Sequence, residues 1–315
     1  MIKSILIQNF FRFGGTYLYN QITEKNQNVL GFYEPFHEHL SDYERIKEEK
    51  KIFESKNKRL RHYSKSFYYS NFPHNEKWFK IFHQKNKIKL NLFHQTKNDE
   101  KEYINYIKEL ISIAHNKNEI PIFKINRLYF SPTIFNITDS LTIFLIRQPV
   151  SSFFSNIDLN FLRPYYKNIE TLALQNIQPF FDLQKIIKNN KIKEISIKDE
   201  KLHFDGRQQL ILHYSIFFFL WIYGLNKNIF YSNLLINYDY LSNIEYSNSI
   251  KSDFFLKTNL ILDLDNFKRI ENKLHNLQLE IIDEVSELIF KYINYNKLKE
   301  ELKIRNCNNL LTYLI

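Results

Sequence analysis

Short apolar runs alternate with a turn and a helical segment at the start of the chain. Residues 2–8 and 29–33 are apolar and rich in β-branched or aromatic side chains, which predicts two strands. Between them, residues 9–15 hold two of the five glycines and predict a turn, and residues 16–23 have helical character. A strand, a loop, a helix and a second strand are the order of a βαβ unit, so we expect a parallel sheet.

The same alternation continues along the chain. Residues 101–115 carry apolar side chains at helical spacing, and residues 120–125 follow as a strand with Pro121 near its start. Residues 140–146 (SLTIFLI) form an almost continuous apolar run, which is typical of a central parallel strand. Residues 234–237 (LLIN) predict the last strand. The chain is therefore expected to have an α/β fold.

Helices are expected in the remaining segments. Residues 153–163 predict a helix and a loop, residues 172–187 a helix interrupted at Pro179, and residues 207–223 an apolar helix. Residues 277–302 predict one or two amphipathic helices at the C-terminus.

Residues 40–100 are polar, basic and aromatic without clear periodicity, so we expect a helical and irregular insert there. No internal repeat and no linker rich in Pro, Gly or Ser divides the sequence. We therefore predict a single α/β domain over residues 1–315.

Composition excludes several classes of protein. A hydrophobic fraction of 44% and an aromatic fraction of 17% exclude a chain that is disordered throughout. The single cysteine, Cys307, cannot form an intramolecular disulfide, and no Cys/His spacing resembles a zinc site. The formal charge of +10 favours an anionic partner, but abundant Asn, Ile, Lys, Phe and Tyr are typical of an AT-rich genome and weaken this argument.

The sequence does not predict a targeting or membrane segment. The first apolar run contains Lys3 and lacks a small-residue cleavage site, and the apolar stretch at residues 215–225 is shorter than the roughly 20 residues of a spanning helix. We expect a soluble, cytoplasmic protein.

The first candidate motif is residues 9–18 (NFFRFGGTYL), between the first strand and the first helix. Glycines let the backbone approach an anion closely, and the N–H groups of a helix start point toward it. Arg12 supplies charge and Thr16 a hydroxyl, so the motif predicts a phosphate-binding loop; the alternative is a tight turn with a surface arginine. It is not a Walker A loop, because GxxxxGK[ST] is absent and no lysine precedes Thr16.

The second candidate motif follows the strand at residues 140–146. Arg147 comes directly after that strand, and Ser155 lies eight positions later on the expected helix. Such a pair is suited to hold a second anion. The alternative is an arginine that caps a loop, followed by serines that cap a helix.

Together the two motifs resemble the sulfotransferase superfamily that uses 3′-phosphoadenosine 5′-phosphosulfate (PAPS). Its members have a parallel-sheet fold related to that of P-loop kinases, and they hold the 5′-phosphosulfate in a loop of the form (K/R)SGT or (K/R)SGTT. The resemblance implies that Arg12, Gly14 and Thr16 contact this group, and that Arg147 and Ser155 bind the 3′-phosphate. It also implies that Tyr17 lies near the adenine.

The first loop departs from the family pattern at two positions. Phe13 stands where serine is usual, and Gly15 replaces a residue that is often threonine or serine. Contacts from these two positions to the cofactor would then come from backbone N–H groups. The glycine-rich segment near the C-terminus of cytosolic animal members is also absent, so bacterial carbohydrate sulfotransferases are the nearer comparison.

The resemblance also places candidate groups for the reaction. Residues 31–38 (GFYEPFHE) resemble the strand end that carries a carboxylate in many bacterial members, which implies Glu34 as the general base and His37 as the alternative. A third possibility is that Glu34 only begins a turn. Residues 123–127 (FKINR) resemble a strand end whose Lys124 or Arg127 contacts the acceptor or the sulfonate, although surface charge is the simpler interpretation. Trp221 and Asp239 are expected to be structural.

The resemblance implies an enzyme that transfers a sulfuryl group from PAPS to an acceptor hydroxyl, most plausibly of a carbohydrate. PAP is the expected product, and neither a metal nor a nucleic acid is expected to take part. Two alternatives remain open from the residues alone. One is a P-loop-like nucleotide kinase or NTPase; the other is a non-catalytic RNA- or polyanion-binding protein that uses the basic run at residues 56–61.

Overall fold

The α/β architecture is confirmed by a computed structural model of the chain. The structure describes residues 2–10, 13–55, 67–86, 97–131, 137, 139–157, 162–190, 207–265, 267, 279–305, 307, 310, 311 and 314. Contacts within the chain divide it into two compact units. The sheet unit comprises residues 1–9, 14–145 and 231–268, and the helical unit comprises residues 10–13, 146–230 and 269–315.

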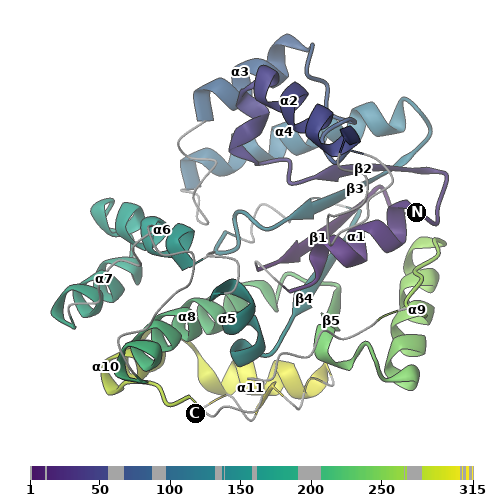
Figure 1. Cartoon of the computed structure of the whole chain (residues 1–315). Helices are drawn as coiled ribbons and strands as arrows, with labels where there is room; N and C mark the ends of the chain where they lie inside the picture. Colours follow the sequence, from purple (N-terminus) through teal and green to yellow (C-terminus); the bar gives the residue numbers. More distant parts are fainter. Residues whose placement is uncertain are drawn as a thin grey trace. The chain divides into compact units, whose positions relative to one another are not determined.

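The described part of the sheet unit is built on five parallel strands in the order β2-β3-β1-β4-β5 (Figure 1). The strands are β1 (Ser4–Asn9), β2 (Val29–Tyr33), β3 (Ile120–Ile125), β4 (Ser140–Ile146) and β5 (Leu234–Asn237). In the register of the central strands, Leu6 of β1 lies opposite Phe123 of β3 and Thr142 of β4. All strands point the same way, so the segments that follow them leave from one edge of the sheet.

The two faces of the sheet pack against different helices. On one face, Phe32 and Phe123 stack with ring centroids 5.2 Å apart and join a core cluster that includes Tyr103 and Ile107 of α4 (Lys97–His115). On the other face, α1 (Gly15–Thr23) contacts the strands β1, β2 and β3. Burial on both faces explains why these strands are continuous apolar runs rather than alternating ones.

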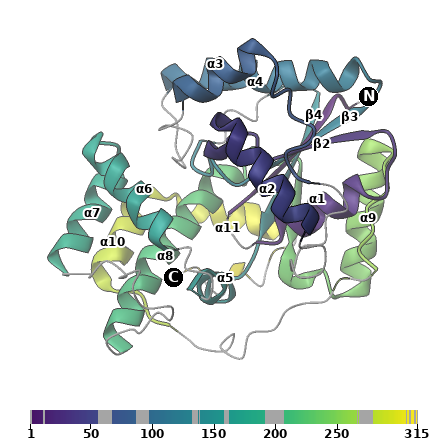
Figure 2. The same cartoon turned by 45° about the horizontal axis from the view of Figure 1, so that its top comes forward.

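The predicted insert contains helices in its described part. They are η1 (Glu38–Ser41), α2 (Tyr43–Ser55) and α3 (Lys77–Asn86). Figures 1 and 2 show α3 and α4 side by side, and Phe82 of α3 stacks on Tyr106 of α4 with centroids 4.0 Å apart. The basic run at residues 56–61 lies outside the described residues.

The sheet unit ends with two elements after β5. They are η4 (Tyr238–Tyr240) and α9 (Ile244–Thr258). The sequence analysis missed α9, because only Ser247, Ile250 and Phe254 are buried on it and this stripe is too narrow to show in the pattern.

The helical unit consists of six helices in its described part. They are α5 (Pro149–Ile157), α6 (Leu162–Leu174), α7 (Phe180–Asn189), α8 (Arg207–Asn228), α10 (Asp283–Tyr292) and α11 (Tyr295–Ile304). The break between α6 and α7 contains Pro179, as predicted, and the C-terminal segment forms two helices.

Helix α8 has 22 residues, and its most apolar 18-residue window has a mean hydropathy of 1.2, so it is long and apolar enough to cross a membrane. Of its most apolar window, 78% is buried inside the protein, and buried core helices of soluble proteins have the same length and composition. The aromatic side chains of α8 pack on one another, for example Phe218 on Trp221 and Phe219 on Tyr223. The length and composition of α8 are therefore weak evidence for a membrane span, and the cytoplasmic location stays a prediction. The single-domain organisation also stays a prediction.

Candidate functional site

Helix α1 begins directly after β1 at two glycines that the packing requires. Gly14 is the N-cap of α1 and has a left-handed φ of 92°. A Cβ added to Gly14 would lie 2.2 Å from Cε2 of Tyr238, and one added to Gly15 would lie 1.9 Å from Oδ1 of Asn9. Both positions exclude any side chain, because Tyr238 packs closely against Gly14 and Asn9 against Gly15.

The N-terminus of α1 has the properties of an anion-binding end. Within the described part of the chain, no side chain caps α1 and no acidic residue lies in its first turn. The first N–H groups of a helix have no partner within the helix, and the helix dipole places partial positive charge there. The expected phosphate-binding role of this loop fits these properties.

The hydroxyl of Thr16, in the first turn of α1, is hydrogen-bonded to a residue of β2. Its Oγ1 lies 2.9 Å from the hydroxyl of Tyr33, the last residue of that strand. The neighbouring Tyr17 contacts Phe267 edge-to-face, and partial burial raises the pKa of its hydroxyl to about 12, with Asp263 adding to the shift. The position of Tyr17 near an adenine stays a prediction.

Glu34 follows β2 and is held in an unusual conformation. Its φ is 50°, a left-handed value that costs a non-glycine residue roughly 1–2 kcal/mol. Its backbone N–H donates to the carbonyl of Lys124, 2.8 Å away. Strained residues of this kind persist where the surrounding structure fixes them, and they cluster at functional sites.

The carboxylate of Glu34 forms a buried ion pair with Lys124. Lys124 Nζ lies 2.5 Å from Oε1 of Glu34, and the two residues are only 1% and 3% exposed. Oε2 accepts a hydrogen bond of 3.2 Å from the backbone N–H of Asn126 and lies 3.6 Å from Arg127 Nη1. These contacts leave Oε1 with a second lone pair.

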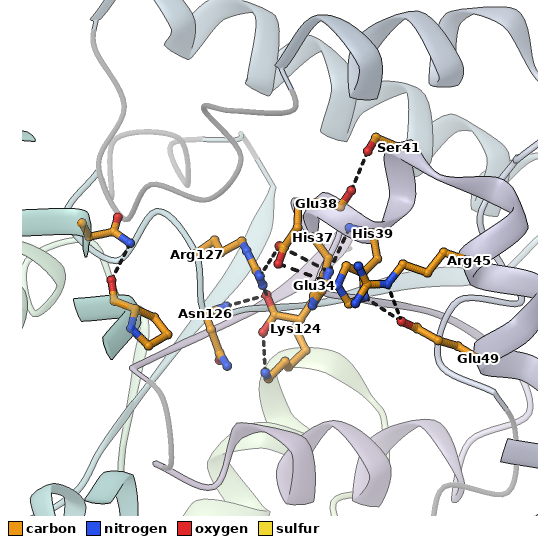
Figure 3. A network of polar contacts seen from close by, with 12 residues as sticks. Glu34, His37, Glu38, His39, Ser41, Arg45, Glu49, Lys124, Asn126 and Arg127 are labelled. Carbon is orange, nitrogen blue, oxygen red and sulfur yellow. Dashed lines mark hydrogen bonds and ion pairs between the residues drawn. The ribbon is translucent and has the colours of Figure 1, made fainter. Parts of the chain in front are cut away.

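A chain of charged and polar groups continues from this pair toward α2, as Figure 3 shows. Arg127 also bonds Glu38, and Glu38 Oε2 lies 3.4 Å from Nδ1 of His37. His39 Nδ1 lies 2.8 Å from Oε1 of Glu49 on α2. The chain therefore links the end of β3 to the helix α2.

His37 is arranged as a neutral imidazole. Burial, and then the positive charge of Arg127, hold its pKa well below its usual range. Its Nδ1 accepts a hydrogen bond of 3.1 Å from the backbone N–H of His39, which assigns the proton to Nε2. The lone pair on Nδ1 of the neutral ring is thus already used, and the roles of Glu34 and His37 as a base stay predictions.

His37, Glu38 and His39 place potential metal-ligand atoms within 4.8 Å of one another. All three groups are already engaged, since Glu38 is paired with Arg127, His37 Nδ1 accepts from the backbone of His39, and His39 Nδ1 lies 2.8 Å from Oε1 of Glu49. A metal bound through these atoms would have to displace these contacts. The cluster is therefore arranged as a network of hydrogen bonds and ion pairs rather than as a set of open ligands.

Arg12 and Phe13, two residues of the predicted phosphate-binding loop, differ in what the structure shows of them. Arg12 lies outside the described residues. Phe13 belongs to the helical unit, where it is fully buried and packs edge-to-face on Phe10 with centroids 5.8 Å apart. The aromatic residue at the family's serine position is thus a packing residue, and its side chain is turned to the core.

Arg147 and Ser155 both belong to the helical unit. Arg147 stands between β4 and α5 and is 7% exposed, and its carbonyl accepts a hydrogen bond of 2.9 Å from Nε1 of Trp221. Ser155 is half-buried on α5. Trp221 is fully buried, in keeping with its expected structural role, and the binding of a 3′-phosphate by Arg147 and Ser155 stays a prediction.

The sequence analysis assigned no role to three residues that the structure brings into the site. They are Tyr33, which bonds Thr16, Glu38, which pairs with Arg127, and Asn126, whose backbone bonds Glu34. The available signal was position, because each lies at or just after the carboxyl end of a strand.

Comparisons of the chain with known proteins find no match. No protein-family model, no curated protein and no solved structure matches the chain. The functional argument therefore depends on the residues and their geometry.

Proposed function

We propose that the protein is a sulfotransferase that moves a sulfuryl group from PAPS to an acceptor hydroxyl of a carbohydrate. The observation that carries the proposal is the proximity of an anion-binding helix end to a buried carboxylate. The hydrogen bond between the hydroxyls of Thr16 and Tyr33 ties the start of α1 to the residue that precedes Glu34. An anionic donor and a proton acceptor therefore belong to one edge of the sheet.

The α1 end fits the phosphosulfate part of PAPS. Gly14 and Gly15 leave no Cβ in the loop, and Thr16 offers a hydroxyl. Backbone N–H groups directed at a phosphate oxygen stabilise the negative charge that develops on the leaving group during transfer. Phe13 cannot supply the usual serine hydroxyl, so the backbone carries more of this task.

The Glu34 pair fits the acceptor side of the reaction. In the proposed step, the acceptor oxygen forms a bond to sulfur while the bond from sulfur to the bridging oxygen breaks and its electron pair stays on PAP. The proton of the acceptor hydroxyl passes to Oε1 of Glu34, which keeps a lone pair beside Lys124. Lys124 Nζ, 2.5 Å from that oxygen, balances charge there and positions the carboxylate.

A thermal-shift experiment with PAP tests the donor site. ADP and AMP serve as controls because they lack the 3′-phosphate. PAP at 100 times its dissociation constant contributes about 2.7 kcal/mol, which raises the melting temperature by roughly 5–10 °C at about 2–4 °C per kcal/mol. We expect a shift with PAP that exceeds the shifts with ADP and AMP.

Two variants identify the residues responsible. Arg147→Ala should remove the preference for PAP, whereas Lys167→Ala, which removes an exposed positive charge in the same unit, should retain it. Glu34→Gln should keep PAP binding and lose sulfuryl transfer to a panel of sugars. Equal shifts with PAP, ADP and AMP, or none with any of them, would remove the basis for calling the protein a sulfotransferase.

A further inference from the structure

Tyr33 is fixed in place by three aromatic or charged neighbours. Its ring stacks on Tyr68 with centroids 4.1 Å apart and planes 19° apart, and it meets the edge of Tyr19 at 5.5 Å. Lys124 Nζ lies 4.6 Å from the ring centroid, in a cation–π contact. The ring therefore has little freedom, and its hydroxyl is aimed at Thr16.

The hydrogen bond between the two hydroxyls constrains where the proton of Thr16 points. Each hydroxyl has one hydrogen to donate. Where Tyr33 donates to Oγ1 of Thr16, the hydrogen of Thr16 is free to be donated to another acceptor. An anion at the start of α1 is such an acceptor, and a chain of hydrogen bonds in which each donor is polarised by the previous one is strengthened.

We infer that Tyr33 is a positioning residue for anion binding at α1. Its hydroxyl donates to Thr16 Oγ1 and thereby directs the hydroxyl hydrogen of Thr16 toward a phosphate oxygen of the donor. This inference rests on the proposed function for the identity of the ligand. Tyr33 would then connect the start of α1 with the Glu34 ion pair. Its hydroxyl orients Thr16, and its ring contacts the ammonium group of Lys124, which pairs with Glu34.

Tyr33→Phe tests the inference, because it removes the hydroxyl and keeps the ring stacking and the cation–π contact. The measurement is the dissociation constant of PAP by isothermal titration calorimetry, with the melting temperature of the free protein as a check on folding. We expect PAP to bind about 3–10-fold more weakly. Tyr19→Phe is the matched control, since its ring touches Tyr33 but has no hydrogen bond to Thr16, and we expect its PAP affinity to stay within twofold of wild type.

A double-mutant cycle separates positioning from packing. Thr16→Val should weaken PAP binding at least as much as Tyr33→Phe, and the double variant should bind no more weakly than Thr16→Val alone. Wild-type affinity in Tyr33→Phe, or additive losses in the double variant, would overturn the inference. Failure of the wild-type protein to bind PAP would instead refute the proposed function, and the inference with it.

A second pair of variants decides the matter if Tyr33→Phe fails to fold. Thr16→Ser keeps the hydroxyl and should retain PAP affinity within about threefold, whereas Thr16→Val should lose it. Equal affinities for these two variants would show that the hydroxyl oriented by Tyr33 is not used, and would overturn the inference.

Discussion

The buried pair of Glu34 and Lys124 predicts an asymmetric pattern of stability losses. The perturbations are Glu34→Gln, Lys124→Met and the double variant, each of which approximately preserves side-chain volume. The side chains of Glu34 and Lys124 are 4% and 2% exposed, respectively. Removing one charge therefore leaves the other charge buried, with neither water nor its main partner beside it. Such uncompensated buried charges cost about 3–5 kcal/mol.

The two single variants differ because their remaining partners differ. In Glu34→Gln, the ammonium group of Lys124 keeps a neutral amide oxygen and the ring of Tyr33 but loses its counter-charge, so we expect the full loss of about 3–5 kcal/mol. In Lys124→Met, the carboxylate of Glu34 keeps the N–H of Asn126 and the guanidinium of Arg127, so we expect a smaller loss of about 2–3 kcal/mol. The double variant leaves no unpaired charge, and we expect it to be more stable than Glu34→Gln alone.

Equilibrium unfolding in urea measures these differences as changes in the free energy of unfolding. Lys3→Met is the control, because Lys3 forms an ion pair of 2.8 Å with Asp139 in which the two side chains are 62% and 54% exposed. Exposed pairs contribute about 0–1 kcal/mol, so this variant should stay close to wild type. Losses below about 1 kcal/mol in both buried variants, or strictly additive losses in the double variant, would refute the reasoning from burial.

Two further predictions concern backbone conformation and pH. Gly14→Ala places a Cβ at a φ of 92° and 2.2 Å from Tyr238, so urea unfolding should show a loss of at least about 1–2 kcal/mol, and a neutral result would contradict this backbone geometry. Burial lowers the pKa of His83 from its usual 6.5 to about 3. The unfolded chain gains a proton below pH 6.5 while the folded one does not, so this contribution to stability is complete above pH 6.5 and declines by up to about 1.4 kcal/mol per pH unit toward pH 3. His83→Phe should flatten that decline in urea unfolding curves measured between pH 7 and pH 4, and an unchanged slope would show that His83 is not the group responsible.

Much of the sheet was predictable from the sequence because its strands are buried on both faces. The predicted strands at residues 29–33, 120–125, 140–146 and 234–237 coincide with those of the structure, and the first strand is shifted by one or two residues. A strand that is buried on both faces has a continuous apolar run, which can be recognised in the sequence without knowing which strands or helices pack against it. Helix α9 leaves no such trace, because most of its residues are partly or fully exposed.

The site was predictable in position but not in its pairings. Glu34 and Lys124 were singled out through the resemblance of their segments to strand ends of the family, and in the structure they lie just after β2 and near the end of β3, at one edge of the parallel sheet. The ion pair between them depends on the register of β2 and β3, in which Tyr33 lies opposite Lys124. These residues are about ninety positions apart in the sequence, and neither periodicity nor composition encodes that register.

The connectivity of the sheet places the loop with Gly14 and Thr16 where open parallel sheets bind ligands. After β1 the chain passes beyond β3 to β2, whereas after β4 it continues to β5 on the opposite side, so the connections from β1 and β4 diverge. Ligands of open parallel sheets bind beyond the carboxyl ends of strands at such a switch point. Asn9 and Leu145 lie opposite each other in the register, so β1 and β4 end together. Within the sheet unit, the segment that follows β1 is the loop with Gly14 and Thr16, which the sequence analysis selected on chemical grounds. Had β1 been an outer strand, this loop would lie away from the switch point.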